Sequence, residues 1–198
     1  MTNHRRILYV ASNNRHKIEE ISAMAGPGWD VRAAQDAAPG ISWNETGTTF
    51  EENARIKADV LRQHTKCCVL ADDSGLQVAA LNGAPGVWSS SYGGTEGDHA
   101  SNNARLLSEM EHIPEQKRSA KFVCTLLFID ETGRERIFLG ECRGTILKTP
   151  RGSQGFGYDP LFAVEGFPGK TMAELTLAEK NLISHRSMAM ARWKDGCC

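Results

Sequence analysis

The sequence lacks the features of a membrane protein and of a protein that binds duplex nucleic acid. No apolar run approaches the roughly 20 residues of a membrane-spanning helix, and the run at residues 7–11 is too short for a signal-peptide core. With 23 basic and 24 acidic side chains the net charge is −1, so no overall charge attracts nucleic acid or an anionic membrane. We therefore expect a soluble, cytoplasmic protein in which a local cluster of side chains holds any bound anion.

Familiar cysteine and glycine motifs are also missing. The cysteines show neither the CxxC spacing of a zinc site nor the framework of a secreted disulfide-rich protein, so we expect them to be reduced. Neither the glycine pattern of a Walker loop nor that of a dinucleotide-binding turn occurs. The six cysteines are Cys67, Cys68, Cys124, Cys142, Cys197 and Cys198.

Hydrophobic periodicity predicts an α/β fold around a mixed sheet. No repeat or linker divides the chain, so we expect one domain over residues 1–198, with the last few residues disordered. Capping boxes begin with Thr49 and Thr176, and Ser184 can cap the last helix. Strands are expected at 7–11, 29–34, 66–73, 119–130 and 135–140, and helices at 15–25, 50–61, 100–110, 176–184 and 185–193.

A polar turn, SNNRHK, joins the first predicted strand to the first predicted helix. The first N–H groups of a helix lack partners within it and lie at the positive end of its dipole, so a phosphate can bind there. Lys17 adds a full positive charge, although a plain polar helix cap would also account for the turn. The candidate phosphate ligands are Ser12, Asn13, Asn14, Arg15, His16 and Lys17.

Two adjacent aspartates, Asp72 and Asp73, follow the apolar run at residues 69–71. Neighbouring side chains of a strand point to opposite faces, so the two carboxylates must have different roles. One is expected to face the ligand crevice at the end of the strand, and the other to meet supporting donors or a shared cation. A cation such as Mg²⁺ would offset their repulsion, whereas a simple strand-ending turn is the alternative.

Three further groups of residues could bind a nucleotide. In GFGYDP, Phe156 and Tyr158 offer stacking surfaces and Asp159 an acceptor, unless the loop simply packs on the core. Lys57 borders the apolar stripe of a predicted helix and needs either water or an anion. In EKNLISHR, the candidate residues for binding a base are Lys180, His185 and Arg186. A lone histidine is more often structural, and this interpretation applies to His4, His64, His99 and His112.

Taken together, these motifs resemble the inosine triphosphate pyrophosphatase family. The segments SNNRHKIEEI, ETGTTFEENARIKA, ADDSGLQVAALNGAPGVWSSSY, GFGYDPLF and EKNLISHR occur in the family's order and spacing, and the resemblance covers about residues 7–193. It implies hydrolysis of ITP, dITP and XTP to the monophosphate and pyrophosphate, a need for Mg²⁺, and a homodimer. It also implies an elongated two-lobed fold of mixed-sheet α/β type with the active cleft between the lobes.

The resemblance also assigns roles to individual residues. Glu45 and Asp73 match the metal ligands, and Asp73 matches the proton acceptor. Residues 12–17 match the phosphate loop and Lys57 a triphosphate contact. The remaining substrate contacts implied by the family are Ser74, Phe156, Gly157, Tyr158, Asp159, Lys180, His185 and Arg186.

One departure and two alternatives follow from the same motifs. Family members usually read S-A-R-Y where this chain has Ser89 to Tyr92, so Ser91 replaces an arginine and its charge. A Maf-type pyrophosphatase of other modified nucleotides would share the fold, but the SHR motif argues against it. A nucleotide-binding regulator without turnover is the non-enzymatic alternative, and the presence of Glu45, Asp73 and Lys17 argues for activity.

Overall fold

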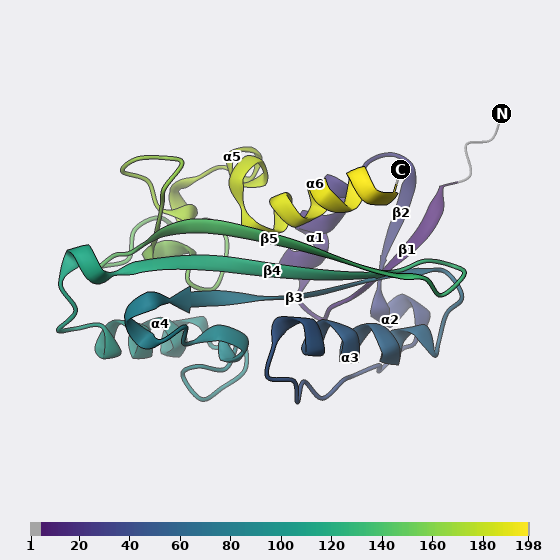
Figure 1. Ribbon diagram of the computed structural model, residues 1–198, viewed down its shortest axis with the longest axis horizontal. Helices are drawn as coiled ribbons and strands as arrows, with labels where there is room; N and C mark the ends of the chain where they lie inside the picture. The colour runs from purple at the N-terminus through teal and green to yellow at the C-terminus, as the bar shows by residue number, and fades with distance from the viewer. Residues whose placement is uncertain (1–4, 198) are drawn as a thin grey trace. The chain divides into compact units, whose positions relative to one another are not determined.

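The computed structural model describes residues 5–197, so His4 and Cys198 lie outside the described part of the chain. Its centre is a six-stranded sheet with the order β2-β1-β3-β4-β5-β6 (Figure 1). β1 pairs in parallel with β2 and β3, whereas β5 and β6 are antiparallel, which confirms the predicted mixed α/β sheet. The strands are β1 (Arg6–Ala11), β2 (Trp29–Ala33), β3 (Cys68–Val78), β4 (Ser119–Ile129), β5 (Glu135–Ile146) and β6 (Phe162–Val164).

Helices alternate with the first strands and then follow the hairpin of β4 and β5. No helix within residues 5–197 is long and apolar enough to cross a membrane. The α-helices are α1 (Arg15–Ala25), α2 (Ala34–Ala37), α3 (Phe50–Arg62), α4 (His99–Glu109), α5 (Leu177–Ile183) and α6 (His185–Cys197). Short 3₁₀ turns lie at Ala79–Leu81, Gly86–Trp88, Glu115–Lys117, Asp159–Leu161 and Met172–Glu174.

The chain forms two compact units, each assembled from separate segments. Unit 1 contains the chain up to Asp73, Cys124–Gly140 and the residues from Met188 onward; unit 2 contains Ser74–Val123 and Glu141–Ser187. The boundary in β3 falls between Asp73 and Ser74, in the middle of a strand. No change of composition marks such a boundary, which is why the sequence predicts a single domain.

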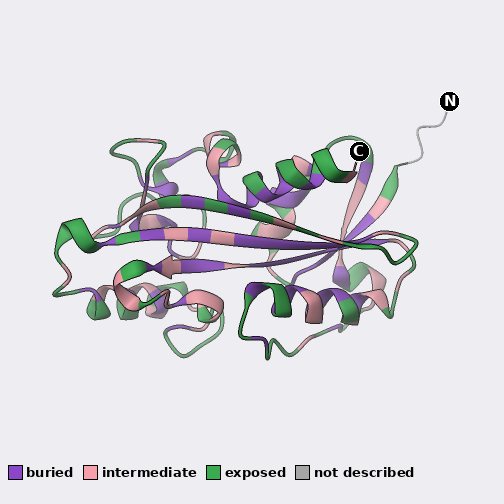
Figure 2. Ribbon diagram, in the orientation of Figure 1, coloured by how far each residue is buried: buried purple, intermediate pink, exposed green. Residues whose placement is uncertain are grey.

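Unit 1 packs its sheet between two helical layers. On β3, Cys68 and Leu70 join the apolar cluster that contains residues of α1 and α6, whereas Val69 and Ala71 join the cluster of α3. Most of β3 is buried (Figure 2). Strand alternation continues this division to the next two residues, so Asp72 and Asp73 face opposite layers.

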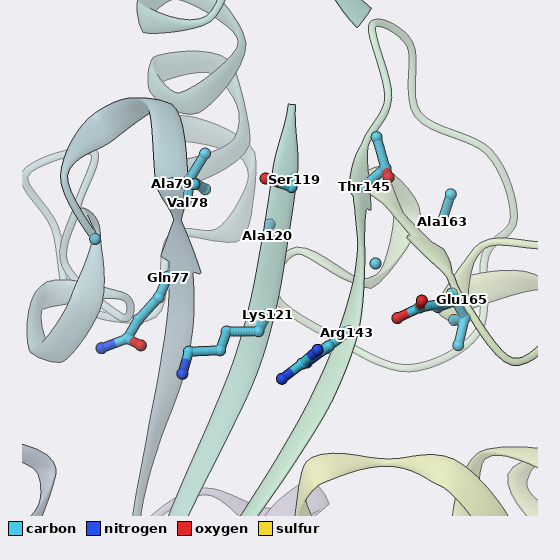
Figure 3. Close-up of a pocket in the computed structure, with 13 residues that line it drawn as sticks. Gln77, Val78, Ala79, Ser119, Ala120, Lys121, Arg143, Thr145, Ala163 and Glu165 are labelled. Atoms are coloured by element: carbon cyan, nitrogen blue, oxygen red, sulfur yellow. The ribbon is translucent and has the colours of Figure 1, made fainter. Parts of the chain in front are cut away.

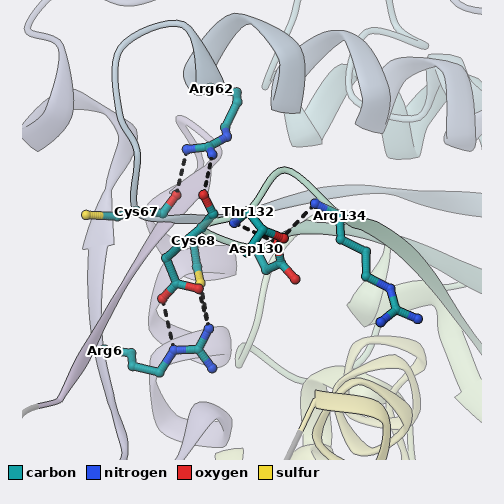
Figure 4. A network of polar contacts seen from close by, with 8 residues as sticks. Arg6, Arg62, Cys67, Cys68, Asp130, Thr132 and Arg134 are labelled. Carbon is teal, nitrogen blue, oxygen red and sulfur yellow. Dashed lines mark hydrogen bonds and ion pairs between the residues drawn. The ribbon is translucent and has the colours of Figure 1, made fainter.

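A polar network ties β1 to the turn after β4 within unit 1 (Figure 4). The Arg6 guanidinium contacts both carboxylate oxygens of Glu131, at 3.0 and 2.5 Å, and donates to Cys68 Sγ at 3.3 Å. Arg62 donates to the backbone oxygens of Thr65 and Glu131 at 2.7 and 3.0 Å. The pKa of Glu131 is lowered to about 2, chiefly by the hydrogen bond from Arg6. Burial raises the pKa of Cys68 to about 12.

Unit 2 surrounds a second apolar core and a buried arginine. The core includes Tyr92 and Leu106 beside Phe122 and Phe162. Arg118 is only 2% exposed, and its guanidinium donates to four backbone oxygens, those of Met110, Ile113, Ile146 and Leu147. Backbone carbonyl groups thus accept the hydrogen bonds of this buried cation.

The predicted caps are confirmed. Thr49 and Glu52 exchange hydrogen bonds at 3.2 Å at the start of α3, Thr176 and Glu179 form the equivalent box at α5, and Ser184 Oγ accepts from Ser187 N at 3.1 Å. Two predicted ends were wrong. β5 continues to Ile146 rather than residue 140, and α6 includes Gly196 and Cys197, which we expected in a disordered tail.

The predicted end of β3 was also wrong. The strand runs to Val78, so Asp72 and Asp73 lie in its interior and not at its carboxyl end. Ser74 and Gly75 have turn-forming tendencies, but the burial of Leu76 and Val78 on either side of Gln77 is the alternation of a strand.

Candidate active site

The ammonium group of Lys57 joins two carboxylates in unit 1. Lys57 Nζ lies 2.5 Å from Asp73 Oδ1 and 3.1 Å from Glu45 Oε2. Lys57 is 3% exposed, so it is held by anions and does not extend to water. Of the two explanations that its position on α3 allowed, the structure supports the ionic one.

Local structure explains why Glu45 reaches this lysine. Glu45 lies in an irregular segment that is fastened to the first turns of α3, where Asn53 Oδ1 accepts from Gly47 N at 2.8 Å and Glu52 Oε2 from Thr48 N at 2.7 Å. Asn53 and Lys57 are four residues apart and therefore on one face of the helix. The same helix thus supplies the lysine and anchors the glutamate.

Burial and charge act against each other at Asp73. Burial raises the pKa of Asp73 to about 6, although the charges of Lys57 and Lys17 lower it. At Lys57, burial lowers the pKa, but the charges of Asp73 and Glu45 outweigh this effect and keep the ammonium protonated. Asp73 Oδ2 is buried and has no hydrogen-bond partner among residues 5–197. This oxygen is therefore available to a ligand.

Asp72 makes a separate pair on the other face of β3. Its fully buried carboxylate lies 2.7 Å from Lys17 Nζ, and Cys124 Sγ lies 3.3 Å from Asp72 Oδ2. The prediction that the two aspartates have unequal partners is therefore confirmed. Since Asp72 holds the lysine of the predicted phosphate loop, its contact is with a supporting donor.

The residues before Lys17 form the turn and cap of α1. Asn14 is the N-cap, and its Oδ1 accepts from Lys17 N at 3.3 Å, while Ser12 Oγ accepts from Asn14 N at 3.1 Å. Asn13 contacts Gln35, and Arg15 and His16 are exposed. The turn is thus a polar cap, and it also presents cationic side chains and a helix N-terminus to solvent.

A further buried lysine–aspartate pair occurs in unit 2. Lys180 Nζ lies 2.8 Å from Asp159 Oδ2, which also accepts from Phe156 N at 3.0 Å. The Lys180 ammonium lies 4.8 Å from the Phe156 ring centroid. Gly155 has a φ of +74°, and a Cβ at this position would overlap Asp159 Oδ2. Only glycine fits this turn without displacing the ion pair.

Tyr158 was predicted to offer a stacking surface to a ligand, but its side chain is buried. Its side chain is 3% exposed within the unit 2 core, and its hydroxyl donates to Ser89 O at 2.9 Å. Gly157 O accepts from Asn103 Nδ2 of α4 at 3.0 Å. Tyr158 therefore anchors the loop, and Phe156, which is half-buried, is the aromatic residue that can meet a ligand.

The SHR motif begins α6 and is largely buried. The imidazole of His185 stacks on Phe122 with a centroid distance of 4.9 Å and an interplanar angle of 16°. Arg186 donates to Ser74 Oγ at 2.9 Å, and its Cζ lies 6.0 Å from the Phe156 ring centroid. Ser74, Phe156, Lys180 and Arg186 are thus joined by contacts within unit 2.

An open groove of about 660 Å³ lies elsewhere on the unit 2 sheet (Figure 3). Gln77, Lys121 and Arg143 project from three strands along it, and Lys121 pairs with Glu141 at 2.5 Å. The groove includes none of the predicted substrate-binding residues. The groove is therefore separate from the candidate site, which consists of the side-chain contacts described above.

The carboxylates of Glu45 and Asp73 in unit 1 are candidate metal ligands. No group of three or more His, Cys, Asp or Glu side chains suited to a metal occurs within residues 5–197. Mg²⁺, however, prefers oxygen ligands, retains several waters and commonly uses only one or two carboxylates. Glu45 and Asp73 both contact the Lys57 ammonium, and one buried oxygen of Asp73 has no partner among the described residues. These two carboxylates therefore fit the ligand preference of Mg²⁺.

Comparison with known proteins agrees with this reading of the motifs. The model of the Ham1 family matches residues 8–195. The chain belongs to the Ham1 family. Two relatives named dITP/XTP pyrophosphatase are each 47% identical to it: that of Geobacter sulfurreducens, covering 95% of this chain and 94% of the relative, and that of Lactiplantibacillus plantarum, covering 92% and 90%.

Solved structures of the Ham1 family have the same fold. The Staphylococcus aureus Ham1 protein superposes with a TM-score of 0.86 at 36% identity, covering 96% of this chain and 97% of that one. A nucleoside-triphosphatase / dITP/XTP pyrophosphatase from Mycobacterium abscessus has a TM-score of 0.76 at 41% identity, covering 94% and 98%.

The structure shows contacts around this site that the sequence did not predict. The glycines of GFGYDP were expected to let the backbone approach a ligand, whereas Gly155 is needed for the turn beside Asp159. Cys124 reads as an ordinary strand residue, yet it contacts Asp72. His99 was interpreted as structural, whereas the structure places its exposed ring beside Phe156.

Proposed function

We propose that this chain is a metal-dependent pyrophosphatase that hydrolyses ITP, dITP and XTP to the monophosphate and pyrophosphate, and so removes deaminated purines from nucleotide pools. Ham1 membership and the names of the relatives support this activity. The observation that carries it is the Lys57 ammonium between Glu45 and Asp73, with the second oxygen of Asp73 buried and available.

The balance of charge supports a divalent cation, which we propose is Mg²⁺ held by Glu45 and Asp73. The carboxylates of Glu45, Asp72 and Asp73 outnumber the ammonium groups of Lys17 and Lys57. This excess negative charge would repel a triphosphate on its own. When bound, the ion would neutralise phosphate oxygens and stabilise the charge on the leaving pyrophosphate.

In the proposed reaction Asp73 acts on water. Its carboxylate orients the water and accepts a proton as the oxygen attacks the α-phosphorus, and the bond to the β-phosphate oxygen breaks. A general base must be ionised to accept the proton, and the charges of Lys57 and Lys17 favour the ionised carboxylate by lowering the pKa of Asp73. Lys57 and Lys17, with the polar turn at residues 12–17, then offset the charge of the phosphates.

The unit 2 residues are assigned to the purine. Phe156 offers a face for the base, and Ser74, Lys180, His185 and Arg186 surround it with polar groups. A 6-oxo purine presents an acceptor where adenine presents an amino donor, so donors from His185 or Arg186 match hypoxanthine and xanthine. An unpaired buried donor can cost a factor of about 10⁴ in selectivity. Asp159 and Gly157 are the remaining proposed contacts to the nucleotide, and Tyr158 holds the loop that carries them.

We also propose that the enzyme acts as a homodimer in the cytoplasm on free nucleotides rather than on nucleic acid. The near-neutral composition supports the choice of a small substrate, and the family resemblance supports the dimer. Sedimentation equilibrium at micromolar concentration should give twice the chain mass; a monomer that is fully active would contradict the dimer.

Pyrophosphate release from ITP, XTP, dITP, GTP, ATP and dTTP tests the activity and its alternatives. We expect the inosine and xanthine nucleotides to be preferred by a wide margin with Mg²⁺, and turnover to stop in EDTA. Preference for dTTP or another pyrimidine would support a Maf-type enzyme. Binding of ITP without turnover under any metal condition would support a regulator.

A further inference from the structure

The ring of Phe156 has a neighbour that the proposed function does not yet use. His99 lies with its ring centroid 6.3 Å from that of Phe156, at an interplanar angle of 41°. Its side chain is exposed, and Phe156 is half-buried. Lys180 and Arg186 approach the same phenyl ring with cationic groups. Two aromatic rings therefore meet at the part of unit 2 assigned to the purine.

The position of His99 is fixed by the fold. It is the first residue of α4, whose N-cap Asp98 accepts from Ser101 N at 3.1 Å and from Ser101 Oγ at 2.6 Å. One turn further on, Asn103 donates to Gly157 O at 3.0 Å. Residues at i and i+4 share a helix face, so the contact that fastens α4 to the loop also directs His99 toward Phe156.

The two ring centroids lie slightly closer together than a base clamp requires. Flat groups stack at about 3.5 Å, so a base between two rings needs centroids about 7 Å apart. The observed centroid distance of 6.3 Å is slightly shorter, and the two rings are tilted by 41°. The exposed side chain of His99 can rotate to increase this distance. On the basis of the proposed function, we propose that His99 and Phe156 hold the purine between them, which makes His99 a further substrate-binding residue.

Such a clamp increases the affinity for the nucleotide but does not discriminate between the substituents of the base. Every purine has a π-face, so stacking is tolerant of the exocyclic groups. His99 therefore contributes equally to the binding of ITP, XTP and dITP, whereas the hydrogen-bond donors of the SHR motif distinguish them from adenine nucleotides. The phosphates and the attacking water do not contact this clamp, so kcat does not depend on it.

His99→Ala tests the clamp against His99→Phe. We expect the alanine variant to raise the KM for ITP, XTP and dITP by the same factor, about 5- to 10-fold, with kcat unchanged within about twofold. The phenylalanine variant should keep the wild-type KM within about twofold because it retains a ring. Inhibition by inorganic triphosphate, which has no base, should be the same in all three proteins.

His112→Ala is the matched control, because His112 is an exposed histidine of unit 2 outside the site. An unchanged KM in His99→Ala, or a loss that extends to inorganic triphosphate, would overturn the clamp while leaving the proposed function intact. If the wild type released no pyrophosphate, the proposed function would fail instead. Calorimetric binding of inosine monophosphate to wild type and His99→Ala would still decide for or against the clamp.

Discussion

Each unit of the chain contains a buried lysine–aspartate pair, and the two pairs differ in what they leave available. Lys57 and Asp73 are 2.5 Å apart, but Lys57 also contacts Glu45 and one oxygen of Asp73 has no hydrogen bond among the described residues. Lys180 and Asp159 are 2.8 Å apart, and Asp159 Oδ2 also accepts from the backbone of Phe156. The first pair suits chemistry on phosphate, and the second fixes an aromatic loop.

The difference shows that residue types alone do not define a role. Both pairs are nearly inaccessible, and breaking either leaves a charge in a medium where desolvation is costly. What distinguishes them is the third partner: a second carboxylate for Lys57, and the Phe156 ring and backbone for the other pair. Accordingly, changes at the first pair should affect turnover, and changes at the second should affect nucleotide affinity.

Lys57→Met is expected to have the largest effect on stability. It removes the only ammonium that contacts Asp73 among the described residues and leaves this carboxylate buried beside Glu45, so the free energy of unfolding in EDTA at pH 7.5 should fall by about 3 kcal/mol. The loss should be smaller at pH 5, where a protonated Asp73 needs no counter-charge. Urea unfolding followed by the fluorescence of the core tryptophans Trp29 and Trp193 measures it.

Lys66→Met, which removes an exposed lysine, is the control for this comparison and should change stability by less than about 0.5 kcal/mol. Equal stabilities of the two variants would show that the Lys57 contacts contribute nothing to folding.

Gly155→Ala tests the second pair without removing a charge. The added methyl group overlaps Asp159 Oδ2 and the backbone has a positive φ, so Lys180 and Phe156 should shift together. We expect the KM for ITP to rise about tenfold or more, with a smaller change in kcat. Steady-state kinetics measures both. Gly169→Ala has a similar φ of +82° but open space around it, and a KM change as large as that of Gly155→Ala would show that backbone strain alone is responsible.

The exposed pair of Arg6 and Glu131 should have the smallest effect. Its side chains are 46% and 45% exposed, so solvent and salt reduce the contribution to below about 1 kcal/mol. The pKa of Glu131 is lowered to about 2, so the stabilisation is present above its ordinary value of 4.5 and is lost as pH falls toward 2. Glu131→Gln should therefore lower stability slightly at pH 7 and not at pH 2. Urea titrations at both pH values measure this, and a larger loss at pH 2 would contradict the sign.

Local chemistry made much of the fold predictable. Helix α3 and its capping box, the hairpin of β4 and β5, and the different partners of Asp72 and Asp73 follow from periodicity, cap chemistry and strand alternation. These depend on neighbours within a few positions in the chain. The continuation of β3 through Ser74 and Gly75 was missed because pairing in the sheet outweighs the tendency of these residues to form turns.

Long-range contacts explain the features of the candidate site that the sequence did not predict. The burial of Tyr158 depends on its hydrogen bond to Ser89, 69 positions away, and the place of His99 depends on the contact between α4 and Gly157. The sequence pattern around Tyr158 or His99 does not indicate a contact with a residue so far away in the chain. The two discontinuous units are hidden for the same reason, since each is built from segments that meet only in the folded chain.

The kinetics of Asp73→Asn and Asp159→Asn with ITP test the central comparison most directly. We expect Asp73→Asn to lower kcat by about 10³-fold, within the range for loss of a general base, and to keep KM within a few fold. Asp159→Asn should keep kcat within a few fold and raise KM about tenfold. Near-normal turnover by Asp73→Asn, or a loss of kcat confined to Asp159→Asn, would contradict the account.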